Sequence, residues 1–84
     1  MDVRRLVGRN LRRLRLERGL SQERLAYDAD IAPSFISQIE NGKRSPTVTL
    51  LSDLAKTLRV PIVEFFDEGI TSPPKELPRA RRKR

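Results

Sequence analysis

The sequence predicts an all-α fold, a bundle of five helices, because apolar residues recur with the 3.6-residue period of a helix in successive stretches. Short segments with Gly, Pro or Asp separate these stretches. The predicted helices occupy residues 3–18, two segments within 21–42, residues 47–58 and a short segment from 60 to 66. The chain has no Cys, so helix packing alone must hold a core expected to supply only ~3 to 5 kcal/mol.

The first predicted helix, residues 3–18, combines an apolar stripe with an arginine-rich surface. Its stripe consists of Val3, Leu6, Val7, Leu11 and Leu14. Its other sides carry Arg4, Arg5, Arg9, Arg12, Arg13, Arg15 and Arg18. Residues 1–68 contain 12 Lys and Arg against 10 Asp and Glu, so the net charge of this region is small. Its cations nevertheless cluster in this one helix. Such a cluster fits either a nucleic-acid partner or the simple solubility of an exposed helix.

Residues 21–42 predict two short helices joined by a tight turn. Their apolar residues are Leu25 and Ala26 in the first helix and Phe35, Ile36 and Ile39 in the second. Ser21 is suited to cap the first helix, and the connection over residues 29–33 is too short for a long loop. Within it, Asp30 tolerates a left-handed backbone and Pro33 fits the first turn of a helix. Two helices joined in this way are what a helix-turn-helix DNA reader needs.

The outward face of the second short helix is polar. If its apolar residues face inward, the helical repeat leaves a set of short polar side chains outside. These are Ser34, Ser37, Gln38 and Asn41. Such side chains suit a helix in the major groove of B-DNA, about 12 Å wide, where they can meet base edges. An ordinary solvated helix surface is the alternative.

The same residues carry a resemblance to a known family. The motifs are Ser21-Gln22, Leu25-Ala26, Phe35-Ile36-Ser37 and Ile39-Glu40-Asn41-Gly42. With them, the chain resembles the phage repressor and Cro type (XRE family) of helix-turn-helix transcriptional regulators, from about Arg5 to Phe66. Residues 25–47 look most similar to the small controller proteins of restriction-modification systems, and prophage-type repressors share nearly as much. The resemblance implies a repressor-like DNA-binding fold.

The resemblance also implies roles for individual residues. The implied base-reading residues are Ser34, Ser37, Gln38, Pro33 and Ala32. The implied phosphate-binding residues are Gln22, Asn41, Lys43, Arg44 and Ser21. The implied structural pair is Arg15 with Glu40, which would tie the first helix to the third. A helix N-terminus and a loop with two cations both attract phosphate, which agrees with the second group.

Three positions depart from the family pattern. Asp30 stands where Gly is common, Ala32 where Ser or Thr caps the third helix, and Pro33 where a long polar residue is common. A missing N-cap hydroxyl costs about 1 kcal/mol, which Pro33 partly offsets by fixing φ in advance. Because neither Ala32 nor Pro33 has a side-chain donor, each could touch only a thymine methyl group. Specificity is therefore expected to depend on Gln38, Ser34 and DNA shape more than on bidentate Arg–guanine contacts.

The C-terminal helices predict a contact between subunits. Residues 47–58 have one apolar stripe, formed by Val48, Leu51, Leu54, Ala55 and Leu58. The short fifth helix crowds four large apolar groups into five positions: Ile62, Val63, Phe65 and Phe66. These residues either face a second subunit or cap the core of the chain itself. The resemblance implies a two-fold contact that sets two recognition helices about 34 Å apart, so the operator would be an inverted repeat.

Residues 69–84 are expected to form a disordered, Pro-containing basic tail, separate from a DNA-binding domain of residues 1–68. The segment has three Pro residues, 6 Lys and Arg against 1 Glu, and too few apolar groups to fold. It therefore carries most of the net charge of +7. Such a tail either clasps DNA phosphates without sequence preference or is only a solvated end.

Other function classes are disfavoured by residue content. The chain has no His, no Cys and no Gly-rich phosphate loop, so no enzyme, metal site or cofactor is expected. No apolar run approaches the ~18 residues of a membrane helix, so we expect a cytoplasmic protein without membrane contact. Single-stranded RNA binding lacks stacking platforms, because Tyr27 and the three Phe residues fall on expected core or interface faces.

The expected function is a sequence-specific, double-stranded DNA-binding transcriptional regulator that acts as a homodimer on an inverted-repeat operator. Repression by excluding RNA polymerase is favoured, and activation through a polymerase contact is the second mode. The alternative function is an antitoxin-like or adaptor module whose helices hold a protein partner. A partner encoded next to this chain would distinguish that alternative.

Overall fold

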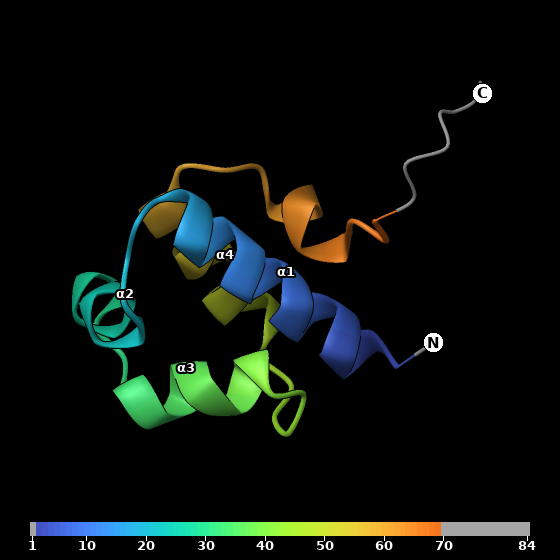
Figure 1. The fold of residues 1–84 in the computed structure, drawn as a ribbon, viewed down its shortest axis with the longest axis horizontal. Coiled ribbons are helices and arrows are strands. Elements are labelled where there is room, and N and C mark those ends of the chain that lie inside the picture. The colour runs from blue at the N-terminus through green and yellow to red at the C-terminus, as the bar shows by residue number, and fades with distance from the viewer. Residues whose placement is uncertain (1, 70–84) are drawn as a thin grey trace.

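The computed structural model describes residues 2–69, which fold into four α-helices and one short 3₁₀ helix (Figure 1). The α-helices are α1 (Val3–Glu17), α2 (Gln22–Ala29), α3 (Pro33–Glu40) and α4 (Val48–Leu58). The 3₁₀ helix, η1, spans Ile62–Phe66. Residues 2–69 contain no strand, so the prediction of an all-α fold is confirmed.

The prediction of a fifth α-helix is wrong, because η1 is wound more tightly. The backbone N–H of Glu64 donates to the carbonyl oxygen of Pro61 at 3.0 Å, which is the i to i+3 bond of a 3₁₀ helix. A segment of five residues is too short for the repeated i to i+4 bonds that make an α-helix cooperative. The predicted basic tail lies outside the described residues, apart from Gly69.

Side chains cap three of the four α-helices at their N-termini. Ser21 Oγ accepts a hydrogen bond of 3.0 Å from a backbone N–H in the first turn of α2, as predicted. Thr47 caps α4 and Asp2 caps α1 in the same way. The start of α3 has no side-chain cap, because Ala32 holds that position and Pro33 begins the helix.

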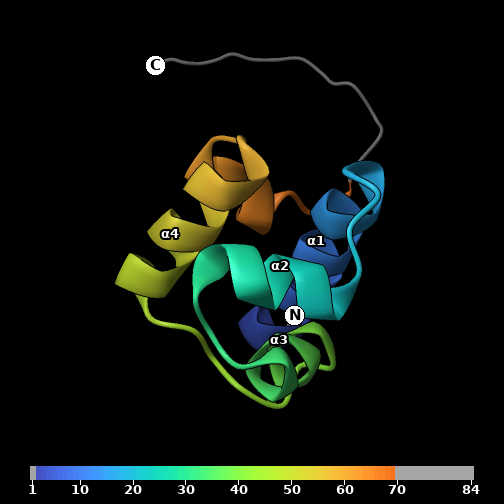
Figure 2. The ribbon, with the colours of Figure 1, turned by 90° about the vertical axis from the view of Figure 1, so that its left-hand side faces the viewer.

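The turn between α2 and α3 depends on Asp30. Its φ of 60° and ψ of 45° lie in the left-handed region, as the sequence predicts. The next backbone N–H, of Ile31, donates to the carbonyl oxygen of Ala26 at 2.9 Å and closes the end of α2. The chain then turns sharply, so that α3 runs across the direction of α2, as the views in Figures 1 and 2 show together.

The core lies where the four α-helices and η1 converge. Its largest fully buried side chains are Phe65, Leu11, Leu25, Ile36, Ile39, Leu54 and Leu58. The predicted stripes therefore face inward, except that Val3 and Val48 are 57% and 75% exposed. Each is the first residue of its helix and lies beyond the reach of the core. Tyr27 is 81% exposed, so of the two expected placements, core or interface, the core placement is wrong.

Helices α1 and α3 approach closely at Gly8. A Cβ atom there would fall on the carbonyl oxygen of Ile39 and lie 2.9 Å from that of Glu40. Only glycine, which has no Cβ, lets the backbone at the end of α3 come this close to α1. The C-terminal end of α3 is therefore held against the middle of α1, while the opposite face of α3 stays free.

Candidate nucleic-acid interface

The outer face of α3 is polar and accessible. On its inner side, Ile36 and Ile39 are fully buried, which confirms the predicted direction of the apolar residues. The outer side carries the exposed Ser34, Gln38 and Asn41 and the half-buried Ser37. In Figures 1 and 2, α3 lies at one edge of the molecule, and no other described element covers this side. A convex polar helix of this kind can enter a major groove.

Ala32 and Pro33 lie at the N-terminal end of this face. Both are exposed next to Ser34. They present only apolar atoms, so they can contact a thymine methyl group but donate no hydrogen bond. The polar side chains on this face of α3 are those of the two serines, Gln38 and Asn41.

A buried ion pair holds α3 to α1. Arg15 Nε donates to Glu40 Oε2 at 2.7 Å and Nη2 donates to Oε1 at 3.1 Å, so the pair is bidentate. The two side chains are only 8% and 2% exposed. Arg15 Nη1 also donates to the carbonyl oxygen of Leu20 at 2.8 Å. The bidentate geometry and the bond to Leu20 offset the cost of removing both charges from water.

Gln22 joins this ion pair from the start of α2. Its Nε2 donates to Glu40 Oε1 at 3.0 Å, so one carboxylate links α1, α2 and α3. The sequence instead predicted that the Gln22 amide contacts a phosphate. In the structure one amide hydrogen faces inward, which leaves the second hydrogen and the backbone N–H groups of Gln22 and Glu23 for an anion, since that of Arg24 donates to Ser21.

One side chain of the loop after α3 folds back onto the helix. Lys43 and Arg44 are both exposed, as expected for residues near phosphate. The Arg44 side chain, however, returns to α3: its Nε donates to Gln38 Oε1 at 2.7 Å. Its guanidinium carbon lies 5.2 Å from the centroid of the Phe35 ring. The spacing of these three residues in the sequence gave no sign of this cluster.

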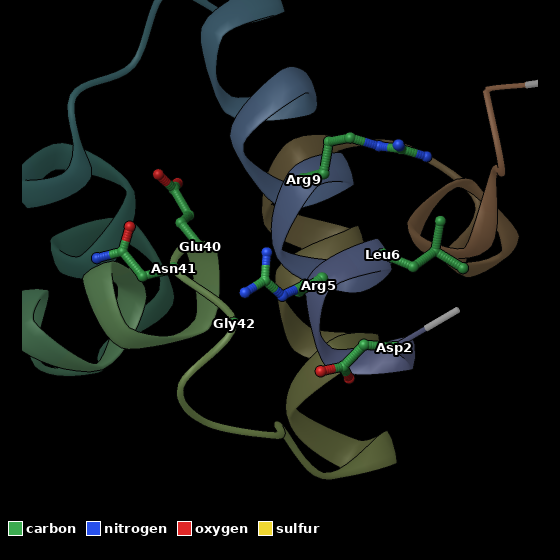
Figure 3. Close-up of a pocket in the computed structure, with 7 residues that line it drawn as sticks. All are labelled: Asp2, Arg5, Leu6, Arg9, Glu40, Asn41 and Gly42. Carbon is green, nitrogen blue, oxygen red and sulfur yellow. The ribbon is translucent and has the colours of Figure 1, made fainter.

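A cleft separates the first half of α1 from the end of α3. Figure 3 shows Arg5 pointing from α1 toward Gly42, with Asn41 on the other side of the cleft. A Cβ on Gly42, whose φ is 73°, would lie 3.0 Å from Cγ of Arg5, so glycine gives room for the arginine stem. Arg5 forms no ion pair within residues 2–69 and adds a cation beside the Lys43–Arg44 loop. Periodicity placed Arg5 on an exposed face but not beside this loop.

The four apolar residues of η1 divide between core and surface. Ile62, Val63 and Phe66 are 38%, 64% and 43% exposed. Phe65 is fully buried among the other helices, so it caps the core of this chain and does not belong to an exposed contact surface. The tight winding of η1 turns one aromatic ring inward and leaves its neighbour outside. Exposed Val3 and Val48 border Phe66 around a small apolar cleft.

A buried amide fixes the position of η1, and sequence patterns missed it. Asn10, on α1, is 2% exposed, and its Nδ2 donates to the carbonyl oxygens of Phe65 at 2.8 Å and Asp67 at 2.7 Å. Arg13, one turn later, pairs with Glu64 at 3.2 Å. The only sequence signal was a polar residue within the apolar stripe of α1.

Residues 2–69 hold no group of three or more acidic, His or Cys side chains placed to bind a metal ion. None of their helices has the length and apolar character needed to cross a membrane.

Known proteins are similar to this chain over most of its length. Residues 11–65 match the helix-turn-helix family HTH_3. The uncharacterized HTH-type transcriptional regulator y4dJ of Sinorhizobium fredii is 45% identical over 65 residues, which cover 77% of this chain and 84% of that protein.

Solved structures agree in fold. The restriction-modification controller protein C.AhdI from Aeromonas hydrophila is 33% identical with a TM-score of 0.72, covering 75% of this chain and 96% of C.AhdI. The controller protein C.Esp1396I, crystallised as a tetramer with its natural 35 base-pair operator, is 35% identical with a TM-score of 0.71. That match covers 79% of this chain and 87% of C.Esp1396I.

Proposed function

We propose that this chain, which belongs to the XRE-type helix-turn-helix family, is a sequence-specific, double-stranded DNA-binding transcriptional regulator. The observation that carries the proposal is the exposed polar face of α3, held from behind by buried contacts and bordered by loop cations. Relatives named as transcriptional regulators, and a controller protein crystallised on its operator, support it. Those relatives are named as regulators and controller proteins, not enzymes, which favours binding over catalysis.

In this proposal the residues around α3 divide into two groups. Base edges are contacted by Ser34, Ser37 and Gln38, with Ala32 and Pro33 against thymine methyl groups. The DNA backbone is contacted by Lys43, Asn41, Arg5 and the N-terminus of α2 at Ser21 and Gln22. Arg15 and Glu40 hold α3 in place and contact no DNA, because both are buried.

We further propose a homodimer built on η1. Its exposed Ile62, Val63 and Phe66 gather large apolar groups that water solvates poorly. A two-fold contact through them would present two copies of α3 to successive turns of DNA, about 34 Å apart, and would require an inverted-repeat operator. Phe65 takes no part, because it is buried within the chain.

The dimer proposal is tested by sedimentation over a range of concentrations. The chain should show a monomer–dimer equilibrium, and Phe66→Ala should shift it toward monomer with little loss of stability. Phe65→Ala is the contrasting variant, since emptying that core position should cost about 3 to 5 kcal/mol of unfolding free energy. A monomer mass at all concentrations, with and without DNA, would contradict the dimer.

As a regulator, such a dimer acts in the cytoplasm by occupying an operator near a promoter. Repression follows where the bound dimer blocks RNA polymerase, and activation follows where an adjacent site brings polymerase into contact with it.

Selection of duplexes from a random pool tests DNA binding. The chain should enrich one inverted-repeat sequence, and Lys43→Ala should weaken all duplexes alike and reduce the salt dependence by about one counterion. Failure of the wild-type chain to enrich any duplex would contradict the proposed function.

A further inference from the structure

Gln38 and Arg44 are joined side chain to side chain on the outer surface of α3. Arg44 Nε donates to Gln38 Oε1 at 2.7 Å, and the guanidinium carbon lies 5.2 Å from the centre of the Phe35 ring. The Phe35 ring is itself partly buried against the core. An aromatic face and an amide oxygen thus hold the guanidinium in one place, by cation–π attraction and a charge-assisted hydrogen bond.

This contact determines which hydrogen-bonding groups face outward. A glutamine amide has one acceptor oxygen and one NH₂ donor group, whereas a guanidinium has donors only. Because Arg44 binds the oxygen of Gln38, the amide is oriented with its NH₂ group away from the arginine. The terminal nitrogens of Arg44 make no hydrogen bond within residues 2–69. The joined pair therefore presents the unbonded terminal nitrogens of Arg44 beside an amide oxygen that already accepts one hydrogen bond.

The bases of DNA differ in what they require from such a pair. Glutamine recognises adenine by accepting from N6 and donating to N7, which is favoured when no other donor competes for the amide oxygen. Guanine presents two acceptors, N7 and O6, on its major-groove edge. A pair whose outward groups are mainly donors therefore matches guanine, whereas the N6 amino group of adenine would meet the donors of Arg44 beside the amide oxygen.

We propose that Gln38 and Arg44 act as one unit that reads guanine, and that Arg44 determines specificity rather than holding a phosphate. This inference rests on the proposed function and deepens it. It replaces the sequence-based expectation that specificity depends little on Arg–guanine contacts. It also explains why the recognition helix needs no long polar residue at Pro33, since the loop after the helix supplies one.

Variants at the two positions separate this role from a phosphate contact. Wild-type chain, Gln38→Ala, Arg44→Ala, Arg44→Lys and Lys43→Ala would each select duplexes from a random pool. The wild type should favour guanine at one base pair of each half-site by roughly 5- to 150-fold. Gln38→Ala and Arg44→Ala should each remove that preference, and Arg44→Ala should shift it toward adenine, because no guanidinium then competes for the amide oxygen of Gln38.

Two further variants serve as controls. Arg44→Lys keeps the charge but lacks the planar fork, so it should retain general DNA affinity and lose most of the guanine preference. Lys43→Ala should weaken every duplex and leave the preference unchanged. Gln38, Lys43 and Arg44 are all exposed, so the melting temperature of every variant should stay close to that of the wild type.

Two outcomes would overturn the inference while the proposed function stands. One is that Arg44→Ala weakens all duplexes by the same factor with an unchanged preferred sequence. The other is that the wild type favours adenine at the base pair whose preference depends on Gln38. A wild-type chain that enriches no duplex would instead refute the proposed function, and this inference with it.

Discussion

Two arginines of this chain make a similar bond in different surroundings. Arg15 donates from Nε to Glu40 at 2.7 Å, and Arg44 donates from Nε to Gln38 at 2.7 Å. The first pair lies between α1 and α3 with side chains 8% and 2% exposed. The second pair lies on the outer face of α3, open to solvent.

The difference teaches that burial, not bond length, separates a structural contact from a recognition contact. A bond inside the protein cannot be replaced by water, so breaking it leaves a charge without a partner. A bond at the surface exchanges readily with water, so it contributes little stability. The outer pair therefore stays accessible to DNA, while the inner network keeps α3 in place.

The largest predicted effect comes from breaking the inner pair. Arg15→Ala should lower the free energy of unfolding by about 3 to 5 kcal/mol, because it leaves the Glu40 carboxylate buried without its cation. That loss is comparable to all the stability expected of so small a core. Urea denaturation followed by circular dichroism measures it. Arg44→Ala is the matched control and should change the free energy of unfolding by less than about 0.5 kcal/mol. An equal loss of unfolding free energy in the two variants would refute the claim that burial separates the two pairs.

A smaller effect is expected at the buried amide of α1. Asn10→Ala should cost about 1 to 3 kcal/mol, because the carbonyl oxygens of Phe65 and Asp67 lose their donor. Asn41, an exposed asparagine at the end of α3, gives the control variant Asn41→Ala. Urea denaturation followed by circular dichroism measures the loss of unfolding free energy in both variants. Asn10→Ala with no more loss than Asn41→Ala would show that η1 is held by apolar packing alone.

The N-terminal cap of α2 should contribute less still. Ser21→Ala removes the oxygen that accepts a backbone N–H at 3.0 Å and should cost about 1 kcal/mol. Ser34→Ala is the control, because that serine lies on the outer face of α3 and caps no helix. Thermal unfolding of the two variants would compare them, and a larger shift for Ser34→Ala would be the contrary result.

The smallest predicted effect depends on pH. The backbone N–H of Arg4 donates to Asp2, and this hydrogen bond holds the pKa of the exposed carboxyl below its usual value of about 3.9. A lowered pKa means that the contribution to stability is full above the usual pKa and is lost as the pH falls through the folded-state value. Stability measured between pH 6 and pH 2 should therefore fall slightly more for the wild type than for Asp2→Asn. An identical pH profile for the two would contradict this.

Much of the fold could be predicted from periodicity and turn chemistry. The apolar residues Leu25, Ile36 and Ile39 recur at helical spacing, and the structure buries all three. Asp30 and Ser21 have the backbone and capping roles that their side chains favour. The error at η1 arose because a five-residue segment with four apolar residues satisfies the pattern of an α-helix and of a 3₁₀ helix equally well.

The candidate site was predictable only in part. The outward direction of Ser34 and Gln38 follows from the burial of Ile36 and Ile39, so periodicity was enough for it. Periodicity could not show that Arg44 returns to Gln38, because a loop has no repeating geometry. It also could not show that Phe65 and Phe66, adjacent in sequence, separate into core and surface.

Local sequence was sufficient to specify the helices, the left-handed turn at Asp30 and the polar face of α3, because each depends on interactions within a few residues along the chain. Only the folded chain determined the contacts of Asn10 with η1, of Glu40 with both Arg15 and Gln22, and of Gly8 with the end of α3. Those contacts join residues far apart in sequence, and their geometry exists only after the helices have packed.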